Sequence, residues 1–194
     1  MAQYLAEQGA KDVILGRSKE KGQALAEKIR LSGNEAAFFV SDVLNKANLE
    51  ENREAIVRKY GKIDVLINAA GGNMPGATIP PDKTIFDIDV SAFRDVIVLY
   101  LFGSVLPTLV FAKAMVDNGK GNIINIASES SFRPLTRVMG YGVAKAAVAN
   151  FTKYMAGELS LKFGDNFRVN AIAPGFFITE QNRSLLLNPD GSYT

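Results

Sequence analysis

The sequence predicts an α/β fold, a doubly wound parallel sheet with helices on both faces, in a single domain spanning residues 1–194. Two observations carry this prediction. Short apolar segments alternate with longer segments of helical periodicity along the chain. Segments such as residues 36–40 are apolar at consecutive positions, which is typical of parallel strands buried on both faces. The chain also shows no internal linker, repeat or low-complexity segment.

The expected elements follow from apolar runs and from residues that begin or end helices. Gly9 is a helix stop, and Ser18 is a helix N-cap. We expect strands at residues 12–17, 36–40, 63–68, 122–128 and 167–173. We expect helices at residues 1–9, 18–31, 46–60, 91–116 and from Tyr141 to about 163, with a Gly- and Pro-rich loop at 71–81.

Composition excludes several classes of function. Lys plus Arg number 22 against 20 Asp plus Glu, a balance that favours neither nucleic acid nor an anionic membrane as partner. The chain has no Cys and no His, so we expect no disulfide, no Ser-His-Asp triad and no metal site with His ligands. No uninterrupted apolar run reaches about 18 residues, and the N-terminus does not resemble a signal peptide. We therefore expect a soluble, cytoplasmic protein.

Tyr141 and Lys145 are the first candidates for chemistry. Four residues apart on a predicted helix, they share one face. A nearby ammonium favours phenolate and lowers a tyrosine pKa that is ordinarily about 10, which suits a general acid/base. Alone, such a pair is more often a partly exposed Tyr beside a solvated Lys. Here Ser128 ends an apolar run 13 residues before Tyr141.

Two further segments of the sequence accompany Ser128, Tyr141 and Lys145. Residues 65–71 run from a strand into a small-residue turn, and residues 169–175 precede Thr179. In this order and spacing the whole chain resembles the short-chain dehydrogenase/reductase family. The resemblance implies a Rossmann-type NAD(P)-binding domain that carries both cofactor and substrate sites. It also implies a catalytic set of Ser128, Tyr141 and Lys145.

The resemblance gives each member of this set a role. Tyr141 would exchange a proton with the substrate oxygen, and Lys145 would also bond the nicotinamide ribose. Ser128 would hold the substrate oxygen as a polarising donor. The alternative for Ser128 is a strand-end hydroxyl that bonds backbone.

The resemblance also implies the residues that bind the cofactor. They are Asn68, Ala70 and Gly71 beside the adenosine ribose, Asp42 and Val43 at the adenine, and Pro174, Gly175 and Thr179 at the nicotinamide amide. Asp42 is otherwise a helix cap, and residues 68–71 are otherwise a tight turn. Arg17 stands where an acid would bind the ribose 2′-OH of NAD. A guanidinium suits a 2′-phosphate, so we favour NADP over NAD, although a solvent-facing Arg is the alternative.

The chain departs from the family pattern in two respects. Tyr100 stands 28 residues before Ser128, where the family usually has an Asn that holds a water in a proton relay; we favour a packing role for Tyr100. The chain also lacks a Gly-rich turn near its start, and it resembles a member without its first strand and its last strand. Because that first strand is central in this fold, its loss would leave a gap of roughly 10 Å in the sheet.

Within the family, residues 71–75, 106–113 and 174–183 resemble the D-mannonate oxidoreductases, of the fructuronate reductase type. This resemblance implies carbohydrate metabolism and a substrate carboxylate. Arg133, Arg137 and Arg183 are candidates to bind the carboxylate, each otherwise a surface Arg. Asn73, Gln181 and Asn182 are candidates to bond the substrate hydroxyls.

Two hypotheses for function result. The first is an NAD(P)-dependent oxidoreductase that acts on a sugar acid such as fructuronate or mannonate. The second is a non-catalytic remnant that serves as a binding or oligomerisation module. Tyr100 and the missing Gly-rich turn favour the second, whereas Ser128, Tyr141 and Lys145 favour the first. Family members commonly form dimers or tetramers, so we expect a homodimer or homotetramer built through the long helix and the Tyr141 helix.

Overall fold

The computed structural model describes the chain except residues 73–74, 176, 179–182, 184–186 and 194. The described residues form two compact units. Unit 1 comprises Met1–Asp64 and Leu106–Lys120, and unit 2 comprises Val65–Val105 and Gly121–Thr194.

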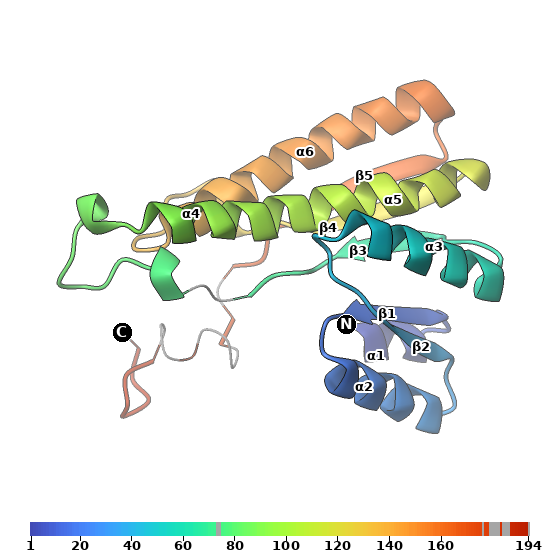
Figure 1. Ribbon diagram of the computed structural model, residues 1–194, viewed down its shortest axis with the longest axis horizontal. Coiled ribbons are helices and arrows are strands. Elements are labelled where there is room, and N and C mark those ends of the chain that lie inside the picture. The colour runs from blue at the N-terminus through green and yellow to red at the C-terminus, as the bar shows by residue number, and fades with distance from the viewer. Residues whose placement is uncertain (73–74, 176, 179–182, 184–186, 194) are drawn as a thin grey trace. The chain divides into compact units, whose positions relative to one another are not determined.

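Unit 1 is a two-stranded parallel sheet with helices packed on it (Figure 1). Its elements are α1 (Ala2–Glu7), β1 (Asp12–Gly16), α2 (Lys19–Leu31), β2 (Ala36–Val40), α3 (Lys46–Tyr60) and most of α5 (Gly103–Asp117). Asp12 of β1 lies opposite Ala36 of β2. The apolar core beneath α1 and α2 consists of Ala6, Ala26, Ile29 and Ala36.

Local sequence explains how the unit 1 helices begin and where they pack. The Ser18 hydroxyl accepts a hydrogen bond from the Lys21 N–H, and Asn45 caps α3 in the same way. Gly22 allows α2 to approach the sheet closely, because a Cβ at this position would lie 2.0 Å from the Phe38 ring. Small residues therefore set the separation of helix and sheet in this unit.

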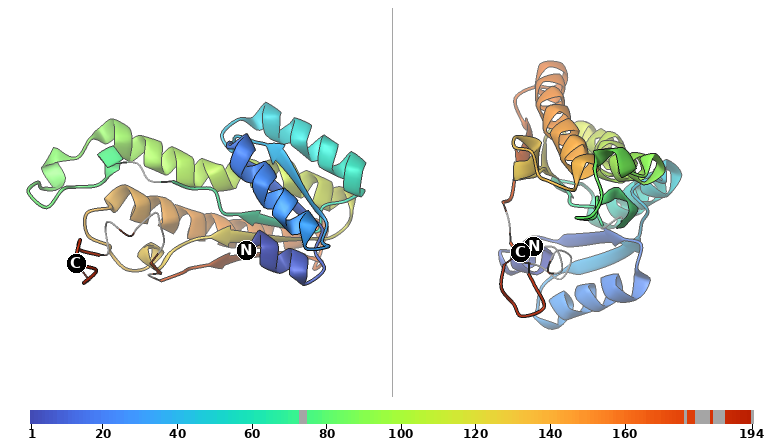
Figure 2. Two further views of the ribbon diagram at one scale, coloured as in Figure 1. Left: turned by 90° about the horizontal axis from the view of Figure 1, so that it is seen from below. Right: turned by 90° about the vertical axis from the view of Figure 1, so that its left-hand side faces the viewer.

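Unit 2 contains a three-stranded parallel sheet in the order β3-β4-β5. Its elements are β3 (Val65–Asn68), α4 (Val90–Ile97), the start of α5, β4 (Gly121–Ile126), α6 (Met139–Phe163) and β5 (Phe167–Ile172). Helix α6 packs on β4 and β5, and it lies side by side with α4 (Figures 1 and 2). One face of β4, which carries Ile123 and Asn125, is fully buried.

The long helix differs from the continuous α-helix that the sequence predicts. A π-helical turn, Val98–Phe102, stands between α4 and α5. At this turn the Ser104 hydroxyl donates a hydrogen bond to the Tyr100 carbonyl, with the two oxygens 3.2 Å apart. A π turn rotates the residues that follow it relative to those before it, so the turn decides which way Tyr100 faces.

The helical stretch Val90–Asp117 is long and apolar enough to cross a membrane by length and composition alone, with a mean hydropathy of 2.0. Core helices of soluble proteins pass the same criterion. Because 56% of its most apolar window is buried within the structure, we interpret it as a core helix.

The predicted fold class, parallel strands alternating with helices, is confirmed. The expected strand at 63–68 begins two residues later, at Val65. Among the described residues, β1–β2 and β3–β4–β5 form separate hydrogen-bonded sheets. The single domain, and the width of the gap left by a missing strand, stay predictions.

Candidate active site

Tyr141 and Lys145 lie one turn apart near the start of α6. The Lys145 Nζ lies 5.7 Å from the centroid of the Tyr141 ring. Lys145 is buried, with 5% of its surface exposed, whereas Tyr141 is half-buried. The pair therefore combines a sheltered ammonium with a phenol that solvent or a ligand can reach.

Burial lowers the pKa of Lys145 to about 8. Its ammonium donates a hydrogen bond to the Ile126 carbonyl, at the end of β4. It also lies 4.8 Å from the centroid of the Tyr100 ring, in the range of a cation–π contact. Lys145 is thus charged at neutral pH but able to exchange its proton near that pH.

Tyr100 is placed by the π-helical turn and is buried. Its ring meets the Tyr141 ring edge to face, with centroids 5.1 Å apart and an interplanar angle of 84°. Its hydroxyl donates to the Gly72 carbonyl at 2.9 Å and accepts from the Gly72 N–H at 3.3 Å. The expected packing role is therefore only part of what Tyr100 does, because the phenol also bonds the turn after β3.

Ser128 follows β4 and caps the short 3₁₀ turn Glu129–Ser131. Its hydroxyl accepts a hydrogen bond from the Ser130 N–H at 3.2 Å. Helix α6 packs on this turn, so Ser128 and Tyr141 belong to adjoining elements. This hydrogen bond to the Ser130 backbone is the alternative role that the sequence predicts for Ser128. It occupies a lone pair and leaves the hydroxyl proton for donation.

Unit 2 also contains a chain of buried amides and a hydroxyl, which adjoins Ile126, the partner of Lys145. Asn68 on β3 donates to the Asn125 side-chain oxygen on β4 at 2.8 Å, and Asn125 donates to the Thr152 hydroxyl on α6 at 2.9 Å. Asn68 and Asn125 are register partners in the sheet. Neither Asn125 nor Thr152 was predicted from the sequence as a site residue. An Asn inside an otherwise apolar strand was the available signal, because a buried amide needs partners.

The turn after β5 lies against the turn after β4. The Pro174 carbonyl accepts a hydrogen bond from the Glu129 N–H at 3.0 Å. Gly71 approaches Tyr100 so closely that a Cβ there would lie 2.5 Å from the ring. Asn68 is buried, Ala70 is half-buried, and Gly71 and Gly175 are exposed. Within unit 2 the structure therefore brings the ends of β3, β4 and β5 together with the start of α6.

The candidates for substrate binding differ in their surroundings, and some of them lie outside the described residues. Arg133 pairs with Glu129, with Nε and Oε1 3.0 Å apart. Arg137 has a left-handed backbone (φ 69°), and its Nε donates to the Ile79 carbonyl. Arg183 is exposed. Asn73, Thr179, Gln181 and Asn182 lie outside the described residues.

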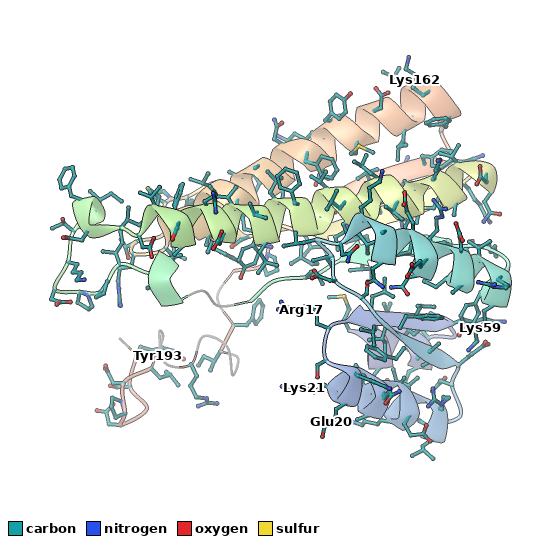
Figure 3. The ribbon with its side chains drawn as sticks, viewed as in Figure 1. Arg17, Glu20, Lys21, Lys59, Lys162 and Tyr193 are labelled. Carbon is teal, nitrogen blue, oxygen red and sulfur yellow. The ribbon has the colours of Figure 1, made fainter. Side chains whose placement is uncertain are left out.

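The remaining cofactor candidates belong to unit 1. Arg17 is exposed at the end of β1, where Glu20 and Lys21 of α2 also lie (Figure 3). An Asp42 side-chain oxygen accepts from the Leu44 N–H at 2.9 Å, so Asp42 makes the local bond expected of a turn residue. Val43 is half-buried.

The family model described as short chain dehydrogenase matches residues 1–189. The uncharacterized oxidoreductase UxuB of Bacillus subtilis is 40% identical over 202 residues, which cover 100% of this chain and 72% of that protein. The chain therefore belongs to the short chain dehydrogenase family, and it is an oxidoreductase by class.

Solved structures agree with this assignment. A provisionally named D-mannonate oxidoreductase from Haemophilus influenzae, crystallised with NAD, has a TM-score of 0.91 and 40% identity over 100% of this chain and 71% of its own. A gluconate 5-dehydrogenase from Burkholderia cenocepacia, in complex with NADP and tartrate, has a TM-score of 0.84 and 29% identity, covering 100% and 76%. The expected likeness to D-mannonate oxidoreductases is thus confirmed.

Proposed function

We propose that this protein transfers a hydride between a nicotinamide cofactor and the carbonyl or hydroxyl group of a small substrate. Ser128, Tyr141 and Lys145 form the catalytic set. The observation that carries the proposal is the buried Lys145 ammonium beside the ring of the more accessible Tyr141. A remnant without catalysis has no need to bury a charge, which costs free energy.

The residues of unit 2 fit a nicotinamide nucleotide. A Lys ammonium has three N–H donors, and the bond to Ile126 uses one of them, so two remain for ribose hydroxyls. A Cβ on Gly72 or Gly175 would meet no atom of the described residues within 4 Å, apart from those of its chain neighbours, so the described part of the chain leaves space beside these backbones. When bound, the cofactor supplies or accepts the hydride.

The protein's own contribution is proton transfer and positioning. Tyr141 gives its proton to the substrate oxygen as a carbonyl is reduced, or takes it as an alcohol is oxidised. The Lys145 ammonium stabilises the phenolate that remains. The Ser128 hydroxyl donates to the same substrate oxygen, where negative charge develops.

Fluorescence titration of the chain with NADH and NADPH tests the proposal, paired with the intact mass of the same sample, which is 21.0 kDa for these 194 residues. We expect saturable binding, and weaker binding in Lys145→Met because the ribose loses its donors. Absence of binding to the folded chain would favour the remnant hypothesis.

We propose NADP(H) as the preferred cofactor because Arg17 offers a guanidinium where β1 ends. The two solved relatives divide on this point, one holding NAD and the other NADP. Arg17→Asp should reverse the preference, since a carboxylate repels a 2′-phosphate and accepts from a 2′-OH. Lys21→Gln, in the first turn of α2, is the matched control. Equal affinities of the Arg17→Asp protein and the wild type for NADPH would show that Arg17 is only a surface residue.

We propose a sugar acid of the fructuronate or mannonate type as substrate, and carbohydrate metabolism as the setting. The names of the two solved relatives, a D-mannonate oxidoreductase and a gluconate 5-dehydrogenase, support a hydroxy acid. Arg133 and Arg183 are the proposed carboxylate partners, with Asn73, Gln181 and Asn182 at the hydroxyls. Fructuronate reduction, followed by NADPH absorbance, is the first assay.

We also propose a cytoplasmic homodimer or homotetramer. Val143, Tyr154 and Leu161 are exposed apolar residues on α6. Their spacing of 11 and 7 residues puts them on one stripe of the helix. Such a stripe suits a second copy of this chain. Sedimentation of the wild type against Leu161→Lys tests this, because a buried Lys would shift the assembly towards monomer.

A further inference from the structure

We propose that Tyr100 is a positioning residue that couples the proton-transfer pair to the turn after β3; this inference rests on the function proposed above. Its ring supports the Tyr141 phenol and the Lys145 ammonium. Its hydroxyl holds the backbone of Gly72. One side chain thereby links the group that moves the proton with the turn expected beside the cofactor.

The first support is the number of functional groups that one buried ring touches. Tyr141 meets it edge to face at 5.1 Å, and the Lys145 Nζ lies 4.8 Å from its centroid. Edge-to-face packing fixes the orientation of the second ring. The face of a Tyr ring is partly negative and attracts an ammonium, the more so where water is excluded. The ring therefore favours the charged form of Lys145 at a place where burial opposes it.

The second support is the pair of hydrogen bonds to Gly72. The Tyr100 hydroxyl both donates to and accepts from the same residue's main chain. A phenol has one proton to donate, and here the Gly72 carbonyl takes it. Tyr100 is therefore a clamp on the turn after β3.

The third support is that the surrounding backbone fixes the position of the Tyr100 side chain. The π-helical turn Val98–Phe102 sets the direction of Tyr100, and the Ser104 hydroxyl satisfies the Tyr100 carbonyl. The Ser104 carbonyl in turn accepts from Asn68, which belongs to the buried chain of amides. Wide helical turns of this kind are frequent at functional sites. Gly71 leaves room for the ring, because a Cβ there would lie 2.5 Å from it.

The decisive measurement is the titration of Lys145 by NMR of the chain labelled with ¹³C at lysine Cε, with the signal assigned by its loss in Lys145→Met. Among the residues that the structure describes, the Tyr100 ring, the Tyr141 ring and the Ile126 carbonyl face the ammonium. In Tyr100→Met the unbranched side chain fills most of the space without an aromatic face. We expect the pKa of Lys145 to fall by about half a unit or more. In Tyr100→Phe the ring remains, and the pKa should stay at the wild-type value.

The hydroxyl is tested separately. Tyr100→Phe removes the clamp on Gly72, so the dissociation constant for NADPH should rise by about fivefold, the usual loss for one or two neutral hydrogen bonds. Turnover should fall further in Tyr100→Met than in Tyr100→Phe, because only the former releases Tyr141 and Lys145.

Two glycines give a matched control that leaves Tyr100 unchanged. Gly71→Ala forces the ring to move, whereas the Cβ of Gly72→Ala meets no atom within 4 Å among the residues described around it. We expect Gly71→Ala to shift the Lys145 titration and Gly72→Ala to leave it in place. An unchanged or raised pKa in both Tyr100→Met and Gly71→Ala would overturn the proposal. The titration needs no turnover, so an inactive wild type would count against the proposed function alone.

Discussion

The two units are built from the same kind of elements, yet they differ in how their buried polar groups are bonded. In unit 1 the core beneath α1 and α2 is apolar, with Ala6, Ala26 and Ile29 at its centre, and the unit also buries the polar side chains of Ser41, Asn52 and Thr108. Unit 2 buries Asn68, Asn125, Thr152 and Lys145 beside its apolar residues. Its core cluster also includes a tyrosine, Tyr100.

Buried polar groups are costly unless each finds a partner. In unit 1, Asn52 binds a single backbone carbonyl, that of Val40. In unit 2 the buried groups bond one another across β3, β4 and α6, and Asn125 of this chain precedes Ile126, whose carbonyl accepts from Lys145. The comparison teaches that unit 2 connects its buried amides to one another next to the candidate site, whereas Asn52 of unit 1 bonds the backbone.

The largest effects should come from the proton-transfer pair. Tyr141→Phe removes the proton that the substrate oxygen exchanges, so turnover should fall about a thousandfold. Because the ring remains, its packing on Tyr100 and the melting temperature should change little. Steady-state kinetics and thermal unfolding of the same sample check both. Turnover within tenfold of wild type would remove Tyr141 from the catalytic set.

Lys145→Met should abolish turnover and yet change stability in a pH-dependent way. The folded-state pKa of Lys145, about 8, lies below its ordinary value of 10.5. Unfolding therefore takes up a proton between these values, and the wild type gains stability as pH rises from 8 to 10.5. Below pH 8 the full cost of burying the charge is present, and there the methionine variant should be the more stable.

Urea unfolding of both proteins at pH 7 and pH 9.5 measures this linkage. The free-energy difference between variant and wild type should shrink by about 2 kcal/mol across that interval. In Lys145→Met, position 145 no longer titrates, so it should contribute no change in the free energy of unfolding between pH 7 and pH 9.5. A pH-independent difference would mean that Lys145 titrates normally, and would contradict the contrast between the two units.

A matched pair of asparagines sharpens the comparison with a smaller effect. Asn125→Leu removes one acceptor of Asn68 and the amide donor to Thr152, and should cost about 2–4 kcal/mol. Asn52→Leu in unit 1 removes one of two side-chain donors to the Val40 carbonyl, the other being Asn48, and should cost about 1 kcal/mol or less. Only the unit 2 variant should also weaken NADPH binding, because Asn68 lies at the end of β3.

Urea unfolding and NADPH titration check the asparagine pair. If both variants lost the same stability and kept the same affinity, the buried chain of unit 2 would be packing alone. The buried asparagines of the two units would then have the same structural role.

Much of the fold could be predicted because the relevant physics is local. Ser18 caps α2, Gly9 and Gly61 adopt positive φ where helices end, and the apolar run at residues 36–40 is a strand. The π-helical turn could not be predicted. A shift in the hydrogen-bond register of a helix leaves no mark on the pattern of apolar residues, and Val98–Phe102 reads as any apolar helix.

The candidate site, like the fold, could be predicted only in part from the sequence. The spacing of Tyr141 and Lys145 puts them on one face of α6, as the sequence indicated. What lowers the pKa of Lys145 is burial, and the groups around its ammonium, the Ile126 carbonyl and the Tyr100 ring, are distant from it in sequence. The pairing of Arg133 with Glu129 was likewise unforeseen, because an exposed i, i+4 pair outside a regular helix has no helical geometry to predict it.

The smallest effects should come from exposed ion pairs, which both units carry. In unit 1, Lys11 and Glu35 lie 3.3 Å apart, and in unit 2, Arg133 and Glu129 lie 3.0 Å apart. Glu35→Gln and Glu129→Gln should each change the free energy of unfolding by less than about 0.5 kcal/mol, because solvent screens such pairs.

The two variants should differ only in substrate affinity. Glu129→Gln releases the Arg133 guanidinium, which can then bind a substrate carboxylate without competition, so the KM for fructuronate should fall about two- to threefold, a difference within the range of one exposed charge pair. Glu35→Gln should leave KM unchanged, and added salt should diminish the effect of Glu129→Gln. A KM unaffected by Glu129→Gln would exclude Arg133 from the substrate site and leave Arg137 or Arg183 as the carboxylate partner.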